Sequence, residues 1–266
     1  MAKVFITSFL AFSCAFIISN LVFSSICRAS KSYGVLPREK VAEYHSRVIS
    51  NLHAAMSCVN AYISLFHLCN EVETIFTSDS CLMNPHRFQY LSIAFSAGYI
   101  LYDTCACLFL IKGLSTPLMK ETLVHHAFVL FGSIAAIYSG HMMITIGVAS
   151  YFTEISTPFV NYRAFMLTHE NSTSRFFSWN NLIFAGLFFI FRVCLYPFLI
   201  WRLGYALYSF HHMLSSDHTK WAIMLALTVM YLALYLLQLF WFYKIIGSIR
   251  RGRKRAATSG GRSPAG

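Results

Sequence analysis

Seven apolar segments, separated by short polar ones, restrict how this chain can fold. A helix needs roughly 20 residues to cross a hydrocarbon core of about 30 Å, and the segments come near that length. With 57% hydrophobic and 12% charged residues, the chain is more apolar than an ordinary soluble domain. The sequence therefore predicts an all-α, multi-pass membrane protein with seven transmembrane helices. The expected spans are Val4–Ile26, Val48–Leu68, Phe88–Ile111, Thr122–Tyr138, Met142–Phe165, Leu182–Ile200 and Trp221–Ile246.

The Lys and Arg residues are distributed unevenly between the two sides of these spans. Sixteen lie at or beyond the ends of the first, third, fifth and seventh spans, four lie on the other side, and Arg192 lies inside the sixth span. Because loops rich in Lys and Arg stay in the cytosol, this split predicts a cytosolic C-terminus and a lumenal or extracellular N-terminus. It also places the Asn-Ser-Thr sequon at Asn171 in the cytosol, where it is not glycosylated.

The first span is consistent with either a cleaved signal peptide or a retained anchor. Its apolar run is longer than that of a signal peptide and its positive charges follow it, so we favour the anchor. We divide the chain into an N-terminal anchor helix and basic loop (1–39), one membrane domain (40–249) and a basic tail (250–266) with the composition of a disordered segment. Beside a membrane, such a tail is expected to contact anionic lipid head groups rather than nucleic acid, or simply to fix the topology.

Eight cysteines do not form the pattern of a disulfide framework, because six lie in or beside apolar spans and are typical of small buried hydrophobes. Cys69 and Cys81 share one loop on the predicted lumenal side, where oxidation can occur. We expect two free thiols there, with a disulfide as the alternative. The chain has no Cys-x-x-Cys pair and no His-rich spacing, so the sequence predicts neither a metal site nor a cofactor.

Polar side chains inside the apolar spans are the candidates for a functional site, because such groups are costly in lipid without a partner or a task. His125 and His126 are adjacent at the start of one span, and Glu154 and Asn161 fall on one helical face of another. Several spans each contribute one or two such groups, which favours an inward arrangement around a common cavity. The predicted cavity residues are His53, Asp103, His125, His126, Glu154, Asn161, Arg192 and Gln238.

Each candidate also has a structural interpretation. Asn161 and Gln238 can hydrogen-bond to a neighbouring helix, and either Asp103 or Glu154 can pair with Arg192 to hold the bundle together. An imidazole can serve as acid, base or nucleophile near neutral pH, so two adjacent histidines favour a role in the site. No catalytic residue is assigned on this basis.

Six short motifs, taken in order, resemble the TLC-domain family, whose best-known members are the ceramide synthases. They occur across most of residues 40–250. The resemblance implies six helices around a lipid-accessible cavity, with the paired histidines facing it, and a location in the endoplasmic reticulum, the plasma membrane being the alternative. The motifs are SRVISNLH (Ser46–His53), SAGYILYD (Ser96–Asp103), VHH (Val124–His126), EISTPFVNYR (Glu154–Arg163), FIFRV (Phe189–Val193) and FWFYK (Phe240–Lys244).

The chain departs from the ceramide synthases at a point that bears on activity. Those enzymes carry a His-Asp dipeptide in the helix after the paired histidines, where this chain has FTEIST (Phe152–Thr157). The resemblance therefore implies, first, a protein that binds or senses lipids and contributes to membrane lipid homeostasis. An acyltransferase that uses His125 and His126, with acyl-CoA and a sphingolipid as partners, is the alternative. A seven-helix receptor is a minor one, because the third span ends in FLIKG rather than in a charged DRY-type triplet.

Overall fold

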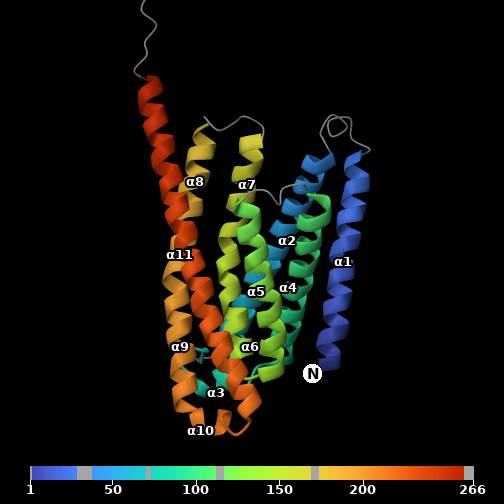
Figure 1. Ribbon diagram of the computed structural model, residues 1–266, viewed down its shortest axis with the longest axis vertical. Coiled ribbons are helices and arrows are strands. Elements are labelled where there is room, and N and C mark those ends of the chain that lie inside the picture. The colour runs from blue at the N-terminus through green and yellow to red at the C-terminus, as the bar shows by residue number, and fades with distance from the viewer. Residues whose placement is uncertain (1, 29–37, 70–72, 112–116, 169–173, 261–266) are drawn as a thin grey trace, which may run out of the picture.

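The computed structural model describes residues 2–28, 38–69, 73–111, 117–168 and 174–260. Over these residues the regular structure is entirely helical, and the long helices run along one axis (Figure 1). The elements are α1 (Ala2–Arg28), α2 (Arg38–Phe66), α3 (Asp79–Met83), α4 (Arg87–Cys105), the π-helical η1 (Ala106–Leu110), α5 (Pro117–Ser139), α6 (Met142–Ala149), the 3₁₀ helix η2 (Ser150–Ser156), α7 (Thr157–Thr168), α8 (Arg175–Phe188), the π-helical η3 (Phe189–Cys194), α9 (Leu195–Ser209), α10 (His211–Leu214) and α11 (His218–Gly260).

Five of the helical stretches are long and apolar enough to cross a membrane. They support the prediction of an all-helical, multi-pass membrane protein, but the predicted count of seven spans is not confirmed. The other two predicted spans correspond to α2 and to the stretch from α6 to α7, which run beside the five (Figure 1). Both carry many polar side chains, described below, which lower their hydropathy. The five stretches are Lys3–Cys27, Arg87–Leu110, Met119–Ser139, Arg175–Ser209 and His218–Gly252.

A tight turn at Gly140 and His141 joins α5 to α6. Gly140 has a φ of +72° and His141 a φ of +48°. Glycine adopts a positive φ without steric cost, because it has no Cβ. The chain therefore reverses within two residues, and α5 and α6 pack against each other as neighbours.

Two prolines interrupt regular helix beside the polar residues of the bundle interior. Pro158 lacks a backbone N–H and follows the 3₁₀ stretch η2. Pro197 cannot donate to the carbonyl of Val193, which instead accepts a hydrogen bond from the Tyr235 hydroxyl at 3.4 Å. The π-helical turn η3 directly precedes this break and carries Arg192. Such irregular turns are frequent at functional sites.

The helix α1 packs along α4 with little space between them. A Cβ at Gly98 would lie 2.9 Å from the Cβ of Phe12, so a larger residue would force the helices apart. The Asn20 side-chain amide also donates to the Tyr102 hydroxyl at 2.6 Å, and both residues are buried. These contacts hold α1 against α4.

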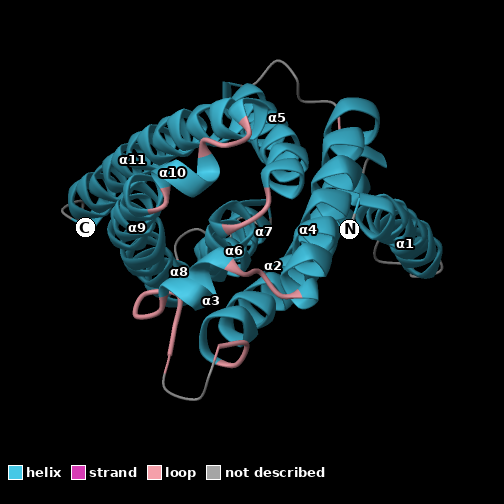
Figure 2. Ribbon diagram, turned by 90° about the horizontal axis from the view of Figure 1, so that it is seen from below, coloured by secondary structure: helices cyan, strands magenta, loops and turns pink. Residues whose placement is uncertain are grey.

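One end of the bundle, which we call the α3 end, is densely packed. Seen from this end, α6 lies inside a group formed by α2, α4, α5 and α9, with α3 beside it (Figure 2). Ile75, Leu82 and Leu199 have no exposed surface. Arg202 of α9 donates to the carbonyl of Ile75 at 2.9 Å and to the Asp79 carboxylate at 2.7 Å. These contacts hold α3 across the end of the bundle.

Cys69 and Cys81 form a disulfide at the α3 end, so the expectation of two free thiols was wrong. Their Cα atoms lie 5.6 Å apart, within the range that a disulfide spans. The proximity arises because α3, which begins at the N-cap Ser78, folds back toward the end of α2 and is held there by Arg202. Sequence spacing alone does not specify that fold-back.

The C-terminal segment also differs from its prediction. Helix α11 continues to Gly260, into the tail that we expected to be disordered from Arg250 onward. Arg, Lys and Ala are good helix formers, and extending an existing helix avoids the cost of nucleation. The loop 29–37, the sequon at Asn171 and residues 261–266 lie outside the described residues.

Candidate functional site

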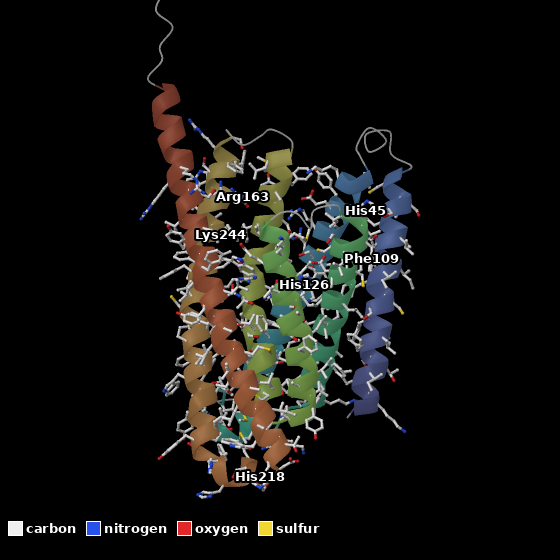
Figure 3. All side chains as sticks on the ribbon, viewed as in Figure 1. His45, Phe109, His126, Arg163, His218 and Lys244 are labelled. Atoms are coloured by element: carbon white, nitrogen blue, oxygen red, sulfur yellow. A yellow bond between two sulfur atoms is a disulfide. The ribbon has the colours of Figure 1, made fainter. Side chains whose placement is uncertain are left out.

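A cavity of about 1760 Å³ opens inside the bundle toward the end opposite α3. We call it the central cavity and this end the cavity end. Its lining residues come mainly from α2, α4, α5, α7, α8 and α11. The helical stretch from α6 to α7 changes its neighbours along the bundle. Helix α6 contacts α2, α4, α5 and α9, whereas α7 contacts α2 and α8. Arg163 and Lys244 lie near the cavity end, His126 lies deeper, and His218 lies at the other end (Figure 3).

Seven of the eight residues predicted from the sequence line this one cavity. The eighth, Gln238, lies directly behind the wall, where its Oε1 accepts a hydrogen bond from Arg192 at 3.2 Å. Gln238 is almost completely buried. The structure thus brings the predicted set together from α2, α4, α5, α7, α11, η2 and η3. The seven lining residues are His53, Asp103, His125, His126, Glu154, Asn161 and Arg192.

His126 is held on both sides of its ring. Its Nε2 lies 3.5 Å from a carboxylate oxygen of Asp103, and its Nδ1 lies 3.1 Å from the Thr104 hydroxyl. The Ser46 hydroxyl donates to the other oxygen of Asp103. Because both ring nitrogens have partners and the side chain is buried, the orientation of this imidazole is fixed. Asp103 therefore pairs with His126, not with Arg192.

His125 has a different environment. Its Nδ1 is buried without a hydrogen-bond partner among the described residues. Its ring packs edge to face on Trp241, with centroids 5.6 Å apart, and the Trp241 indole donates to Glu121 at 2.9 Å. Of the two histidines, His125 is the one with hydrogen-bonding capacity left for a ligand.

Arg192 is buried and lines the central cavity at its inner end. Its Nε donates to the carbonyl of Thr153 at 2.9 Å and to the Ser156 hydroxyl at 3.1 Å. One terminal nitrogen lies 3.5 Å from the Glu154 carboxylate. Of the two pairings considered for Arg192, the structure therefore contains the one with Glu154. A buried guanidinium with this many partners also joins η2 to η3.

His53 and Asn161 make contacts between helices. The His53 ring stacks on Tyr99 with centroids 3.9 Å apart, and its Nε2 lies 3.0 Å from the Ser96 hydroxyl. The Asn161 amide oxygen accepts from Arg47 at 3.1 Å. These contacts join α2 to α4 and to α7. For Asn161 they agree with the structural interpretation given above, although its side chain also lines the cavity.

Residues 43–247 match the TLC domain family, which accounts for most of the chain. The chain belongs to the TLC-domain family. TLC domain-containing protein 4-B of Danio rerio is 28% identical over 250 residues, which cover 90% of this chain and 84% of that protein. TLC domain-containing protein 4 of Xenopus tropicalis is 28% identical over 251 residues, covering 90% and 86%. The family predicted from the motifs is confirmed, and the receptor alternative has no support.

Several residues that line the TLC-domain cavity or contact its lining residues were not among the sequence candidates. Thr104 is a single hydroxyl residue without a distinguishing pattern, Glu121 lies far from its partners in sequence, and the signal available for Ser46 was its place in the motif SRVISNLH. Trp241 could be expected at a membrane boundary, where tryptophans are enriched, but its ring lines the cavity. The signal available for Trp241 was its place in the motif FWFYK.

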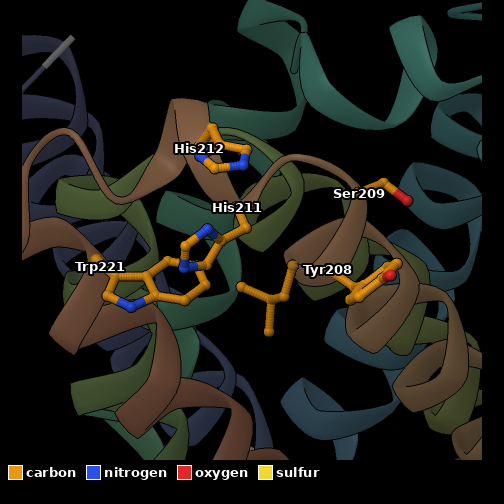
Figure 4. Close-up of a pocket in the computed structure, with 6 residues that line it drawn as sticks. Tyr208, Ser209, His211, His212 and Trp221 are labelled. Atoms are coloured by element: carbon orange, nitrogen blue, oxygen red, sulfur yellow. The ribbon is translucent and has the colours of Figure 1, made fainter.

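A smaller hollow of about 550 Å³ lies at the α3 end of the TLC-domain bundle, beside α10 (Figure 4). His211 packs edge to face on Trp221 there, with ring centroids 5.2 Å apart. No carboxylate lines the hollow, and we assign it no function. Its lining residues are Leu207, Tyr208, Ser209, His211, His212 and Trp221.

Proposed function

We propose that this TLC-domain protein binds a membrane lipid in the central cavity and acts as a lipid-binding or lipid-sensing protein in membrane lipid homeostasis. One observation carries the proposal: a cavity of about 1760 Å³ lies among helices long and apolar enough to span a membrane. Small-molecule sites usually measure about 300–1,000 Å³. The central cavity therefore has room for a ligand with a long hydrocarbon chain.

The chemistry of the wall supports the same proposal. Apolar side chains such as Ile100, Phe184 and Phe188 alternate with the polar groups described above. A lipid presents both kinds of surface, and a few well-placed polar groups are what fixes the orientation of a ligand. The imidazole ring of His125, which lines the cavity, supplies one such group.

Lipid bound to the purified protein tests the proposal. The full chain is purified in a mild detergent, and co-purified lipid is identified and quantified by mass spectrometry. We expect one lipid class to be enriched over the bulk membrane, and His125→Ala to lower that enrichment. His218→Ala is the matched control, because His218 lies exposed at the opposite end. Co-purified lipid with only the bulk composition contradicts the proposal.

A ceramide-synthase-like acyltransferase is the second candidate, and the pair formed by Asp103 and His126 favours it. A histidine oriented by a carboxylate is a common general base. In such a reaction an acyl group would pass from a thioester to an acceptor amine, releasing the thiol. Incubation with acyl-CoA and a sphingoid base, followed by a search for the amide product or for a covalent acyl adduct on His125, distinguishes turnover from binding.

We further propose that the protein resides in the endoplasmic reticulum membrane, with the cavity end facing the cytosol and the α3 end facing the lumen. Basic residues at the cavity end, including Lys244, Arg250 and Arg251, support this orientation, and their extension along α11 suits contact with anionic lipid head groups. The disulfide between Cys69 and Cys81 at the α3 end agrees with an oxidising compartment. Co-localisation of a tagged chain with endoplasmic reticulum and plasma membrane markers tests the location.

A further inference from the structure

The wall of the central cavity reaches the outside of the bundle between α8 and α11. Trp179 and Leu182 of α8 line the cavity, yet they are 64% and 53% exposed. Tyr243 of α11 also lines it and is 77% exposed. A side chain that contributes both to a cavity wall and to the outer surface marks an opening. Because this surface belongs to apolar, membrane-length helices, the opening faces the bilayer.

Small residues of α11 keep this opening clear. Gly247, Ser248 and Gly252 all line the cavity. A Cβ at Gly247 would meet only the flexible end of the Arg251 side chain at 3.3 Å, and one at Gly252 would meet nothing within 4 Å. Close packing therefore does not require these glycines, although each costs about 1 kcal/mol relative to alanine in a helix. Their effect is to leave space at the edge of the cavity.

A cation that has no ion-pair partner among the described residues lies at the same place. Arg163 of α7 donates to the Ser248 hydroxyl at 3.3 Å, and its guanidinium lies 5.8 Å from the centroid of the Phe177 ring. Within the described residues no carboxylate pairs with it, whereas Lys244 nearby is paired with Glu121 at 2.8 Å. Arg163 of α7 thus contacts both helices that frame the opening and keeps its charge available.

Resting on the lipid-binding function above, we propose that the ligand is a phospholipid that enters sideways from the bilayer, between α8 and α11, and places its phosphate on Arg163. A guanidinium binds phosphate oxygens in a bidentate manner and with charge-assisted hydrogen bonds. Trp179 and Tyr243 flank the opening, and amphipathic aromatic rings of this kind lie at the level of lipid head groups. An acyl chain then follows the apolar wall that includes Phe184 and Phe188.

Uptake from vesicles tests both parts of the proposal. The purified full chain is mixed with phosphatidylcholine vesicles that carry an isotope-labelled phospholipid, re-isolated, and assayed for labelled lipid over time. We expect Gly247→Leu, which places a side chain in the opening, to slow uptake several-fold. Gly186→Leu is the matched control, because it adds the same side chain to α8 at a position that is exposed and outside the cavity wall. Gly252→Leu provides a second block should Gly247→Leu not remain monodisperse.

Retention tests the phosphate contact. Loss of a hydrogen-bonded charge typically weakens binding about tenfold or more, so we expect Arg163→Gln to retain about tenfold less phospholipid. Labelled diacylglycerol, which lacks the phosphate, should be retained equally by Arg163→Gln and the unmodified protein. Equal phospholipid retention by both proteins overturns the phosphate assignment.

The remaining outcomes separate this proposal from the function on which it rests. If the unmodified protein takes up no lipid of any kind, lipid binding itself is wrong. If it takes up phospholipid but Gly247→Leu, Gly252→Leu and Gly186→Leu do so at the same rate, the opening between α8 and α11 is wrong. If soluble coenzyme A binds at Arg163 while phospholipid vesicles deliver nothing, the phosphate comes from a water-soluble compound and the membrane route is overturned.

Discussion

The two ends of the bundle differ in which helix lies between the surrounding ones and in what fills the space there. At the α3 end, α6 occupies the middle of the bundle, and side chains such as Leu82 and Leu203 are completely buried around it. At the cavity end, the chain continues through η2 into α7, which packs to one side against α2 and α8. The space that α7 leaves becomes the central cavity, with Arg192 and Glu154 near its floor.

This difference shows that a cavity can arise from the path of one helix rather than from small side chains. The change of path coincides with the 3₁₀ stretch before Pro158, where regular hydrogen bonding is lost. Polar groups then become tolerable inside the bundle, because they face a cavity and one another instead of lipid. At the α3 end, the buried cation Arg202 instead pairs with the partly exposed Asp79.

Two buried arginines, one at each end, give the largest expected effects. Arg192→Ala leaves the Glu154 carboxylate inside the bundle without its cation and should lower the free energy of unfolding by about 4 kcal/mol. Arg202→Ala should cost less, about 2 kcal/mol, because Asp79 is 41% exposed and water replaces the lost partner. Denaturation in mixed detergent micelles measures both. If Arg202→Ala lowered the free energy of unfolding more than Arg192→Ala does, the difference described between the two ends would be wrong.

The disulfide gives the next largest effect and is confined to the α3 end. Cross-linking a loop of this length typically contributes about 3 kcal/mol, so Cys69→Ser with Cys81→Ser should lower stability by about that amount. Lipid retention in the central cavity should change little. Cys14→Ser is the control, because Cys14 is an exposed free thiol on α1. Alkylation without reductant, followed by mass mapping, must leave Cys69 and Cys81 unmodified, and alkylation of both would refute the pairing.

Within the cavity, the two histidines should separate stability from binding. His126→Ala removes partners of Asp103 and Thr104 and should cost about 1–2 kcal/mol of stability. His125→Ala should cost less, since its buried Nδ1 has no partner to lose, but it should reduce lipid retention more. Thermal denaturation and lipid quantification on the same preparations measure the two effects. Equal losses of stability and of lipid retention in the two variants would contradict the different roles assigned to His125 and His126.

Much of this architecture could be predicted from the sequence, because its physical causes are local. Long apolar runs predicted the membrane helices, and the cost of polar groups in lipid singled out His126, Asp103 and the other cavity residues. Which acid pairs with Arg192 could not be predicted, because the choice depends on how η2 and η3 turn relative to α4. The disulfide depends on tertiary packing and has no local signal, and for Trp241 the only signal was its place in the motif FWFYK, which does not specify that its ring lines the cavity.

The last prediction is that the sequon at Asn171 carries no glycan, and it tests which end of the bundle faces the cytosol. Asn171 lies in the connection between α7 and α8, and it begins an Asn-Ser-Thr sequon that would be glycosylated in the lumen. With the cavity end in the cytosol, glycosidase treatment and Asn171→Gln should leave the mobility of the protein unchanged. The positive control is a sequon introduced beside the exposed Asp217 at the α3 end, which should gain a glycan. A glycan on Asn171 and none at the α3 end would mean that the orientation is the reverse of the one proposed. The basic residues of α11 would then lie in the lumen, against the tendency of Lys and Arg to stay in the cytosol.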